Sequence, residues 1–328
     1  MKKSGEMCNK KYIVIGNGQG WCSYGWKSIE NDENFVFYDD VIDISASEPI
    51  NTVCRKHFSF NRKYIKALPF KWIWYRPMLN ALKIDNQTEY VFIFYDWGGL
   101  AKDMCFMKFL RKNIKHLKLV YMFTNIIKIS GAVRYGTLNM LPHYFDKIFA
   151  FDRVDSNKYH FDFTPLIYSK SPTYKENEKT IDVFYIGNAK DRLDDLHSIY
   201  QKCVASNLSC LFYINGVPRQ SQLYPNIHYN ERLTYEEVLK FISHAKCMVD
   251  AIQSGSTAMT IKVCESVLYD KKLITTNENI VKESYYDESR FLLYDEKSEV
   301  ENFVRSSITP YSDEEKAYFS PQYLFNRI

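Results

Sequence analysis

Residues 249–277 have the sequence VDAIQSGSTAMTIKVCESVLYDKKLITTN, and their pattern predicts a strand, a turn, a helix and a second strand. The apolar run 246–250 ends at the small-residue turn QSGST. Apolar positions then recur at helical spacing over 258–269, and an apolar run resumes at 272–276. Both runs are continuously apolar, which is typical of parallel strands buried on two faces. The stretch therefore predicts a βαβ unit.

The same alternation extends over the whole chain and predicts two α/β domains. Further strands are expected at 12–16, 35–38, 90–95, 118–123, 147–151, 181–186, 209–214 and 290–294, with helices near 100–115, 192–206 and 234–245. A chain of 328 residues exceeds what one core usually serves. We therefore expect two Rossmann-like, doubly wound parallel-sheet domains, at 1–168 and 181–305. A polar linker at 169–180 would join them, and a tail at 306–328 would pack back toward the first domain.

Charge and cysteine content narrow the class of protein. Residues 1–169 hold 24 Lys and Arg against 16 Asp and Glu, whereas 170–328 hold 19 against 23, so the first half favours anionic partners. The eight cysteines show neither CxxC pairs nor zinc spacing, which indicates a reducing cytoplasm. No signal peptide is expected in MKKSGEMCNKK, and no apolar run approaches the roughly 18 residues of a membrane span.

A first candidate anion-binding element follows the strand at 181–186. Gly187 permits a tight turn, and Lys190 and Arg192 stand at the start of the next helix. A helix N-terminus with two cations suits a diphosphate. The alternative is a solvated basic turn in which Arg192 pairs with Asp194 or Asp195.

A second such element is the QSGST turn itself, beginning at Gln253. Gly255, Ser256 and Thr257 are expected to present amides and hydroxyls to phosphate oxygens at a helix N-terminus. Farther along that helix come Lys262 and Glu265. If buried, Glu265 would accept hydrogen bonds from ribose hydroxyls. The alternative is a surface glutamate paired with a nearby lysine.

Three segments carry a resemblance to a known family: FDKIFAFDRVDSNKYHFDFTPLIYS (145–169), IDVFYIGNAKDRLDDLHSIY (181–200) and QSGSTAMTIKVCESVLYDKKLITTN (253–277). They resemble GT-B glycosyltransferases of bacterial capsule and lipopolysaccharide synthesis. The resemblance implies two domains facing across a cleft and a metal-independent transfer from a nucleotide-diphosphate sugar, with UDP as the expected nucleotide and no further cofactor. It places the donor on Gly187, Lys190, Arg192, Gln253, Gly255, Ser256, Thr257, Lys262 and Glu265, with the nucleobase of the donor near 229–234.

The sequence departs from that family at two positions. Many retaining members carry two glutamates eight positions apart, and the first would fall at Thr257. An arginine expected in the TIK turn is Lys262, which keeps the charge but loses bidentate geometry. Retaining and inverting outcomes both stay open.

The first strand leads into the glycine-rich stretch IGNGQG, residues 15–20. A dinucleotide fingerprint would need a third glycine where Trp21 stands. An NAD(P)-dependent oxidoreductase is therefore the alternative function, with a catalytically silent GT-B-like binding protein as a third. Under the leading hypothesis, Gly16, Asn17, Gly18 and Gln19 shape the acceptor site.

Residues 51–84 contain eight Lys and Arg, interleaved aromatic residues and no acidic residue. This pattern fits an anionic membrane surface, nucleic acid, or a core segment with a basic outer face. A saccharide acceptor linked to lipid favours the membrane, so we expect peripheral attachment to the inner face of the cell membrane and no nucleic acid. Asp96, at a strand end, is the candidate catalytic base, with His143, Asp152 and Asp155 as rivals.

Overall fold

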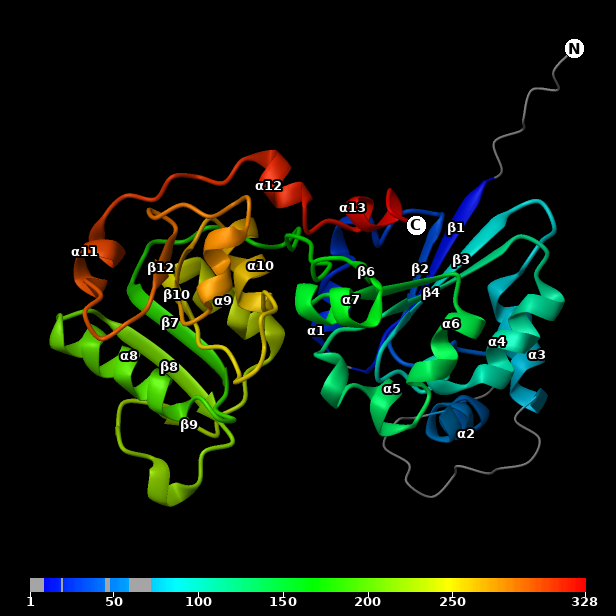
Figure 1. The fold of residues 1–328 in the computed structure, drawn as a ribbon, viewed down its shortest axis with the longest axis horizontal. Helices are drawn as coiled ribbons and strands as arrows, with labels where there is room; N and C mark the ends of the chain where they lie inside the picture. The colour runs from blue at the N-terminus through cyan, green and yellow to red at the C-terminus, as the bar shows by residue number, and fades with distance from the viewer. Residues whose placement is uncertain (1–8, 19, 45–47, 59–71) are drawn as a thin grey trace, which may run out of the picture. The chain divides into compact units, whose positions relative to one another are not determined.

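The computed structural model describes residues 9–18, 20–44, 48–58 and 72–328. The chain forms two compact units, Met1–Thr164 with Arg327–Ile328, and Pro165–Asn326. Each unit is built on a six-stranded parallel sheet with helices against it (Figure 1). The expected fold class, an α/β protein with two Rossmann-like parallel sheets, is confirmed.

The first sheet has the strand order β2-β1-β3-β4-β5-β6. Its strands are β1 (Lys10–Ile15), β2 (Phe35–Tyr38), β3 (Glu89–Tyr95), β4 (Leu117–Met122), β5 (Lys147–Ala150) and β6 (Asp162–Phe163). Strands are added on one side of β1 and then on the other, so the topological switch point lies between β1 and β3. Open parallel sheets bind ligands beyond the carboxyl ends of the strands at such a point.

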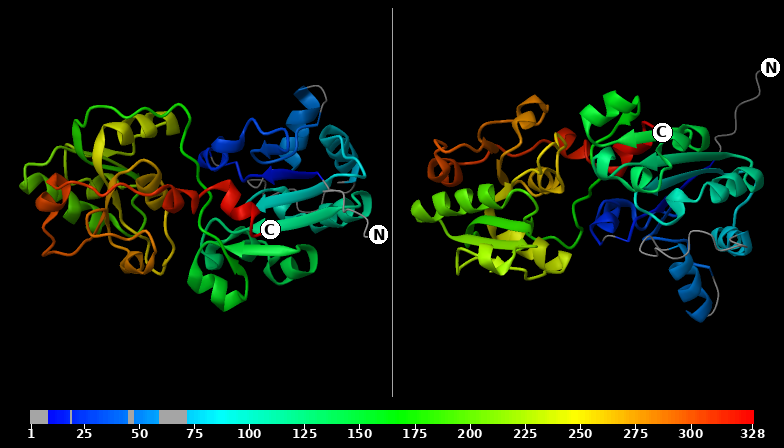
Figure 2. Two further views of the ribbon diagram at one scale, coloured as in Figure 1. Left: turned by 90° about the horizontal axis from the view of Figure 1, so that it is seen from above. Right: turned by 60° about the horizontal axis from the view of Figure 1, so that its bottom comes forward.

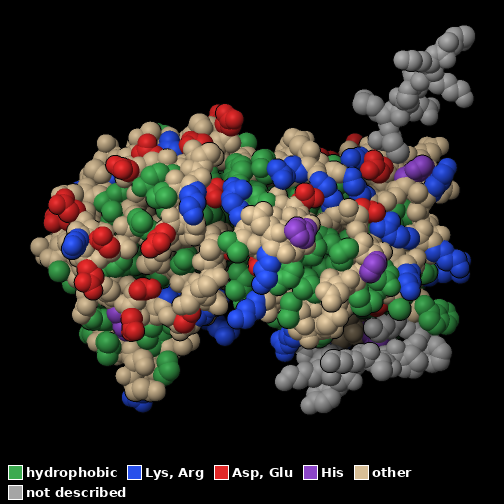
Figure 3. Space-filling model, in the orientation of Figure 1, with side chains coloured by type: hydrophobic (Ala, Val, Ile, Leu, Met, Phe, Trp, Pro, Cys, Tyr) green, Lys and Arg blue, Asp and Glu red, His purple; other side chains and the backbone are tan. Residues whose placement is uncertain are grey.

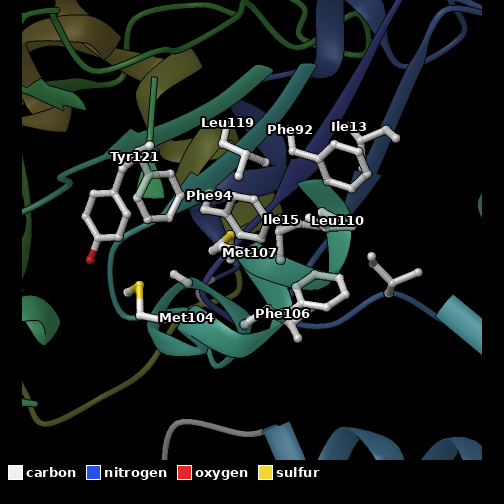
Figure 4. Packing of buried hydrophobic residues seen from close by; sticks show 14 of the residues in the cluster. Ile13, Ile15, Phe92, Phe94, Met104, Phe106, Met107, Leu110, Leu119 and Tyr121 are labelled. Carbon is white, nitrogen blue, oxygen red and sulfur yellow. The ribbon is translucent and has the colours of Figure 1, made fainter. Parts of the chain in front are cut away.

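Most helices of this unit pack on one face of the sheet. The helices are α1 (Trp21–Tyr24), α2 (Glu48–Phe58), α3 (Trp72–Leu82), α4 (Met104–Asn113), α5 (Gly131–Arg134), α6 (Leu141–Tyr144) and α7 (Arg153–Tyr159). Figure 4 shows Phe106, Met107 and Leu110 of α4 facing the strand side chains Phe92 and Phe94. Each fully buried side chain of this kind contributes about 1.5–3 kcal/mol. The other face is covered near Trp26, whose indole Nε1 donates to the Tyr95 hydroxyl at 3.1 Å.

The second sheet has the strand order β12-β11-β10-β7-β8-β9. Its strands are β7 (Ile181–Asn188), β8 (Cys210–Asn215), β9 (His228–Tyr229), β10 (Ala245–Asp250), β11 (Lys272–Thr275) and β12 (Phe291–Leu293). The switch point lies between β7 and β10, because β8 follows on one side of β7 and β10 on the other. The loops after Asn188 and Asp250 therefore meet at this point.

Helices cover both faces of the second sheet, as Figure 2 shows from two sides. The helices of this unit are α8 (Leu193–Ala205), α9 (Tyr235–His244), α10 (Ile261–Leu268), α11 (Val300–Arg305), α12 (Asp313–Ala317) and α13 (Pro321–Phe325). α8 and α11 share one core cluster, while α9 and α10 pack against β10. A capping box between Thr234 and Glu237 starts α9.

The polar stretch 169–180 has no helix or strand and is bound to the second unit. The Ser171 amide donates to the Tyr269 hydroxyl at 3.1 Å, and Asn177 donates to the Ser243 hydroxyl at 2.6 Å. At the other end of the chain, Arg327 donates to the Phe163 carbonyl at 3.0 Å within the first unit. These contacts tie both segments to packed cores.

The charge difference between the halves is visible on the surface. On the face drawn in Figure 3, Lys and Arg side chains predominate on the first unit, and Asp and Glu side chains are prominent on the second. Among the described residues, no helix has the length and apolar character that crossing a membrane requires.

Candidate functional site

The candidate site lies at the switch point of the second sheet, where three consecutive residues after β7 bind the loop after β10. Lys190 Nζ donates to the side-chain carbonyl of Gln253 at 2.7 Å. Asp191 accepts a hydrogen bond from the Ser254 amide at 3.0 Å, and Arg192 Nη1 donates to the Ala251 carbonyl at 2.6 Å. The structure thus brings the two predicted anion-binding elements together.

Arg192 is a structural clamp as well as a cation. Besides Ala251, its guanidinium donates to the Asn188 carbonyl at 3.0 and 3.3 Å. These hydrogen bonds go to carbonyl groups. Asp194 and Asp195, its expected alternative partners, occupy the first turn of α8. Because carbonyls do not neutralise it, the guanidinium keeps its full positive charge at the sheet edge.

Lys190 adds a second positive charge beside the first. Burial, and then the neighbouring Arg192 guanidinium, lower the pKa of Lys190, while Asp191 opposes the shift. Two cations held together raise the free energy of the empty site, and an anion placed between them would lower it. The electrostatics at this edge therefore favour a ligand with negative charge.

The Gly255 turn differs from its predicted position. The Ser256 amide donates to the Gln253 carbonyl at 3.1 Å, and Gly255 has a φ of +76°. A turn with positive φ at its third residue favours glycine. However, α10 begins at Ile261 with Thr260 as its N-cap, so Gly255, Ser256 and Thr257 lie in the preceding loop. The prediction that they lie at the helix N-terminus is therefore wrong. The Thr260 hydroxyl accepts from Lys262 N and fixes the start of α10 three residues farther along the chain.

Asp250, at the end of β10, anchors this loop from below. It is almost fully buried and accepts hydrogen bonds from the hydroxyls of Thr260 at 2.8 Å and Thr275 at 3.3 Å. Burial raises the pKa of Asp250 despite these bonds and the nearby Arg192 and Lys262. Asp250 thus fixes the start of α10 relative to the strand ends.

Glu265 is fully buried in α10, and both carboxylate oxygens are used. Oε1 accepts from the Tyr235 hydroxyl at 2.6 Å, and Oε2 accepts from Lys262 Nζ at 2.9 Å. The Tyr235 hydroxyl also contacts the hydroxyl of Tyr168. The structure therefore combines the two alternatives, a buried carboxylate and a lysine-paired one.

Gly187 is the second-last residue of β7, directly before the Lys190 loop. A Cβ at Gly187 would lie 2.6 Å from the Tyr185 hydroxyl, so the bare backbone leaves room for that ring. Burial raises the pKa of Tyr185 to about 12, and Arg192 opposes this effect. Glycine is required here by packing below the sheet edge.

The glycine-rich loop of the first unit is packed between neighbouring strand ends. A Cβ on Gly16 would lie 2.5 Å from the Asp39 carbonyl oxygen. Asn17 Nδ2 donates to the Asp96 carbonyl at 3.3 Å, and Gly18 has a φ of +72°. Gln19 lies outside the described residues. The loop is thus at the switch point of the first sheet, as the acceptor-side hypothesis requires.

Among the described residues, no long helix follows the first strand, where a dinucleotide-binding loop would need one. A pyrophosphate-binding loop needs a helix N-terminus after the first strand. Here α1 has only four residues, beginning at Trp21, and none of its first-turn positions is capped by a side chain. Asp40, which follows β2 where a dinucleotide site would need an acidic residue for the ribose, accepts from the Gly99 amide at 3.3 Å.

Asp96 follows β3 and is fully buried. Its carboxylate accepts from the Tyr121 hydroxyl at 2.7 Å and from the amides of Gly131 at 3.1 Å and Ala132 at 3.3 Å. Burial raises the pKa of Asp96, which these hydrogen bonds oppose. A carboxylate enclosed in this way positions the backbone of α5. Its role as catalytic base stays a prediction.

The rival bases are also placed by the structure. His143 lies in α6, three residues before Asp146 and the start of β5, so it stands at the amino edge of the sheet, opposite the switch point. Asp152 caps α7 by accepting from Val154 N at 2.8 Å. Asp155 accepts from Ile127 N at 2.6 Å. The two carboxylates thus bind backbone amides, and the imidazole lies at the other edge of the sheet.

Part of the basic segment 51–84 is described, as the end of α2 and as α3. Four apolar side chains of these helices are 45–63% exposed: Ile50, Val53, Trp72 and Ile73. The residues 59–71 between the helices lie outside the described residues. Tyr75, Met78 and Leu82 are buried in the first unit, as expected if this segment contributes to the core.

Three site residues escaped sequence reasoning. Asp191 and Asp250 look like ordinary polar residues at strand ends, and only the strand order shows that they meet at one switch point. Tyr235 is the first residue of α9, and its link to Glu265 joins positions 30 apart. The capping box at Thr234 was the available signal, because it fixes where Tyr235 stands in the helix.

Comparisons with known proteins give remote likenesses only. No protein-family model and no curated protein matches the chain. Among solved structures it is similar to TarM, with 11% identity and a TM-score of 0.47 over 73% of this chain and 53% of TarM. It is also similar to the Glycosylation Associate Protein (Gap123) complex from Streptococcus agalactiae, with 10% identity and a TM-score of 0.41 over 79% of this chain and 53% of that one. The chain thus spans about half the length of both matched chains.

Proposed function

We propose that the protein is a glycosyltransferase that moves a sugar from a nucleotide-diphosphate sugar to a saccharide acceptor. The observation that carries the proposal is the pair Lys190 and Arg192 at the switch point of the second sheet, bound across it to Gln253 and Ala251. Two adjacent cations at this position suit a diphosphate, which carries two negatively charged phosphate groups.

In the proposed reaction these cations stabilise the leaving nucleotide diphosphate. Negative charge builds on the phosphate oxygens as the glycosidic bond to the sugar breaks, and fixed positive groups lower the energy of that charge. Lys190 gives up its hydrogen bond to Gln253 and donates to a phosphate oxygen instead. Arg192 keeps its bonds to the carbonyls and stabilises the phosphate charge electrostatically. UDP is the nucleotide we expect, and no metal is invoked.

Glu265 and Lys262 have linked roles in this proposal. Lys262 pairs with Glu265 at 2.9 Å, and its side chain keeps 13% exposure whereas that of Glu265 has none. When a diphosphate is present, Lys262 turns to it and leaves Oε2 of Glu265 available for a ribose hydroxyl. Tyr235 holds the other oxygen at 2.6 Å and keeps the carboxylate in position.

The acceptor is proposed to be linked to lipid at the inner face of the cell membrane, as in capsule or lipopolysaccharide synthesis. Supporting residues are the exposed Trp72 and Ile73 of α3 and Ile50 and Val53 of α2, beside a segment without acidic residues. Exposed rings and apolar side chains near cations suit an anionic lipid surface. Vesicles containing phosphatidylglycerol should sediment the wild-type chain and should sediment a W72S/I73S variant less.

Thermal unfolding with nucleotides tests the donor site. UDP, GDP or dTDP at about 100 times its Kd should add about 2.7 kcal/mol to the free energy of unfolding. Lys190→Ala should abolish this gain, whereas Lys240→Ala, on the exposed side of α9, should keep it. Stabilisation by NADH in place of all three nucleotides would overturn the proposal and favour the oxidoreductase.

Turnover separates an enzyme from a silent binding protein. Purified chain, a radiolabelled UDP-sugar and bacterial membranes should give labelled lipid-linked product, with free UDP released in equal amount. Binding of UDP without release from any of the common UDP-sugars would show a catalytically silent protein.

A further inference from the structure

A pocket of about 650 Å³ lies in the Pro165–Asn326 unit, away from the switch point. Two ion pairs fix α12 beside it. Lys316 Nζ lies 2.8 Å from Asp270, and Arg290 Nη1 lies 2.6 Å from Glu315. Asp270 lies two residues before β11 and Arg290 directly precedes β12, so α12 is held at the amino edge of the sheet. The Lys190 site is at the carboxyl edge of the same sheet.

Most residues that line this pocket are polar and neutral, but apolar atoms make up the larger part of its surface. The lining consists of Ser284, Ser312, Glu314, Glu315, Ala317, Tyr318, Ser320, Gln322, Tyr323 and Asn326. Among these described lining residues there is no Lys or Arg, which argues against phosphate or nucleotide. Five hydroxyls, from three serines and two tyrosines, and two side-chain amides line the pocket. The hydroxyls of Ser312 and Ser320 accept from backbone amides at the starts of α12 and α13, and Gln322 donates to Asn326. Hydroxyls and amides each have more than one hydrogen-bonding position, so they can also serve a ligand with many hydroxyl groups.

Two aromatic rings supply the apolar part of the lining. The rings of Tyr318 and Tyr323 are 4.8 Å apart at 57° to one another, and both side chains are partly exposed. Aromatic faces pack well against the flat C–H face of a pyranose, while its hydroxyls point outward to polar groups. A volume near 650 Å³ falls within the usual range for ligand pockets of about 300–1,000 Å³ and holds a short oligosaccharide.

The two carboxylates differ in their availability. Glu315 is bound to Arg290 and accepts from the Ser312 amide at 2.6 Å, so its charge is compensated. Glu314 is exposed and adds one carboxylate at the rim. One negative charge with two rings also suits an organic cation, but the hydroxyl and amide groups favour a neutral, hydroxyl-rich ligand.

We propose that this pocket is a second carbohydrate site that binds neutral oligosaccharide, separate from the Lys190 site. It goes beyond the proposed function and rests only on the lining between Ser284 and Asn326. For an enzyme that extends a saccharide, such a site would hold a part of the chain that does not react.

The test compares two substitutions of Ala317, an exposed residue whose carbonyl, not its side chain, accepts from Ser320 at 2.7 Å. Ala317→Trp fills the pocket, and Ala317→Ser leaves it open. Full-length chain is applied to an array of neutral oligosaccharides of glucose, galactose, N-acetylglucosamine and rhamnose, and the best binder is titrated. We expect A317W to bind at least about tenfold more weakly than A317S, which corresponds to about 1.4 kcal/mol.

Two further measurements keep the result interpretable. A317W should unfold at the wild-type temperature. If A317W is misfolded, Tyr323→Ala replaces it as the test and should weaken binding of the same saccharide. The proposal is overturned if no array saccharide binds the wild-type chain, if both Ala317 variants bind equally, or if choline binds in place of saccharide. UDP stabilisation measured on the same variants reports the Lys190 site independently, so failure of one site does not imply failure of the other.

Discussion

Arg192 Nη1 lies 2.6 Å from the carbonyl oxygen of Ala251, so a residue that precedes α8 holds the first residue after β10. The contact spans the switch point of the second sheet. Together with the bonds to Asn188 it fixes the backbone on both sides of the candidate donor site. Structural support and positive charge thus come from one side chain.

Arg192→Met should lower both stability and nucleotide affinity. The guanidinium donates to the carbonyl of buried Ala251 and to that of exposed Asn188. Loss of these hydrogen bonds from a charged donor is expected to cost about 1.5–3 kcal/mol in the free energy of unfolding. Urea denaturation measures this cost, and Lys190→Ala, which loses one bond to Gln253, serves as the matched control. Unchanged stability in the methionine variant would show that the guanidinium does not clamp the loops.

Glu265→Gln should destabilise the second unit strongly. The substitution leaves Lys262 without its carboxylate partner in a nearly buried place, and breaking such a pair costs about 3 kcal/mol. Tyr235→Phe removes one hydrogen bond to the same carboxylate and should cost only about 1 kcal/mol. Equal losses in the two variants would argue against the ion pair as the dominant interaction.

Asp96→Asn should lower the stability of the first unit more than it lowers the activity of the folded protein. An amide cannot accept from Tyr121, Gly131 and Ala132 at once without turning its NH2 group toward a donor, so a loss of about 1–3 kcal/mol is expected. Activity per folded molecule should fall far less than removal of a general base would require. A loss of a thousandfold in kcat at unchanged melting temperature would restore the base hypothesis.

Gly99→Ala should be among the most damaging single-methyl changes in the first unit. A Cβ at Gly99 would lie 1.3 Å from the Phe58 carbonyl oxygen, so α2 would have to move, at a cost of at least about 3 kcal/mol. Gly20→Ala is the matched control, because nothing lies within 4 Å of its Cβ position and its φ is −53°. Calorimetric melting temperatures of the two variants should therefore separate widely.

The contribution of Lys179 to the free energy of unfolding should rise between about pH 7 and pH 10. Burial, together with the neighbouring Lys271, lowers the pKa of Lys179 to about 7 from its ordinary value of 10.5, and both ammonium groups contact Glu176. In this window the unfolded chain binds a proton that the folded chain does not, so the free energy of unfolding increases as pH rises. Urea midpoints of Lys179→Met should depend less on pH, whereas Lys240→Met should keep the wild-type slope.

The sequence pattern predicted ten strands, and the structure has a strand at each of these places. For example, the run 181–186 corresponds to β7 (Ile181–Asn188) and the run 272–276 to β11 (Lys272–Thr275). The strands β6 and β9 were missed because they have two residues each, too few to show a pattern. α2 and α3 were missed because aromatic and basic residues obscured their helical spacing.

The sequence by itself determined the α/β class and the small-residue loops, since continuous apolar runs and glycines act locally through burial and backbone freedom. Only the tertiary structure decided which loops meet. Strand order placed Lys190 beside Gln253, enclosed Asp96 under α5 and moved His143 to the opposite edge of its sheet. These outcomes depend on contacts between distant positions, and a linear pattern of polarity does not encode such contacts.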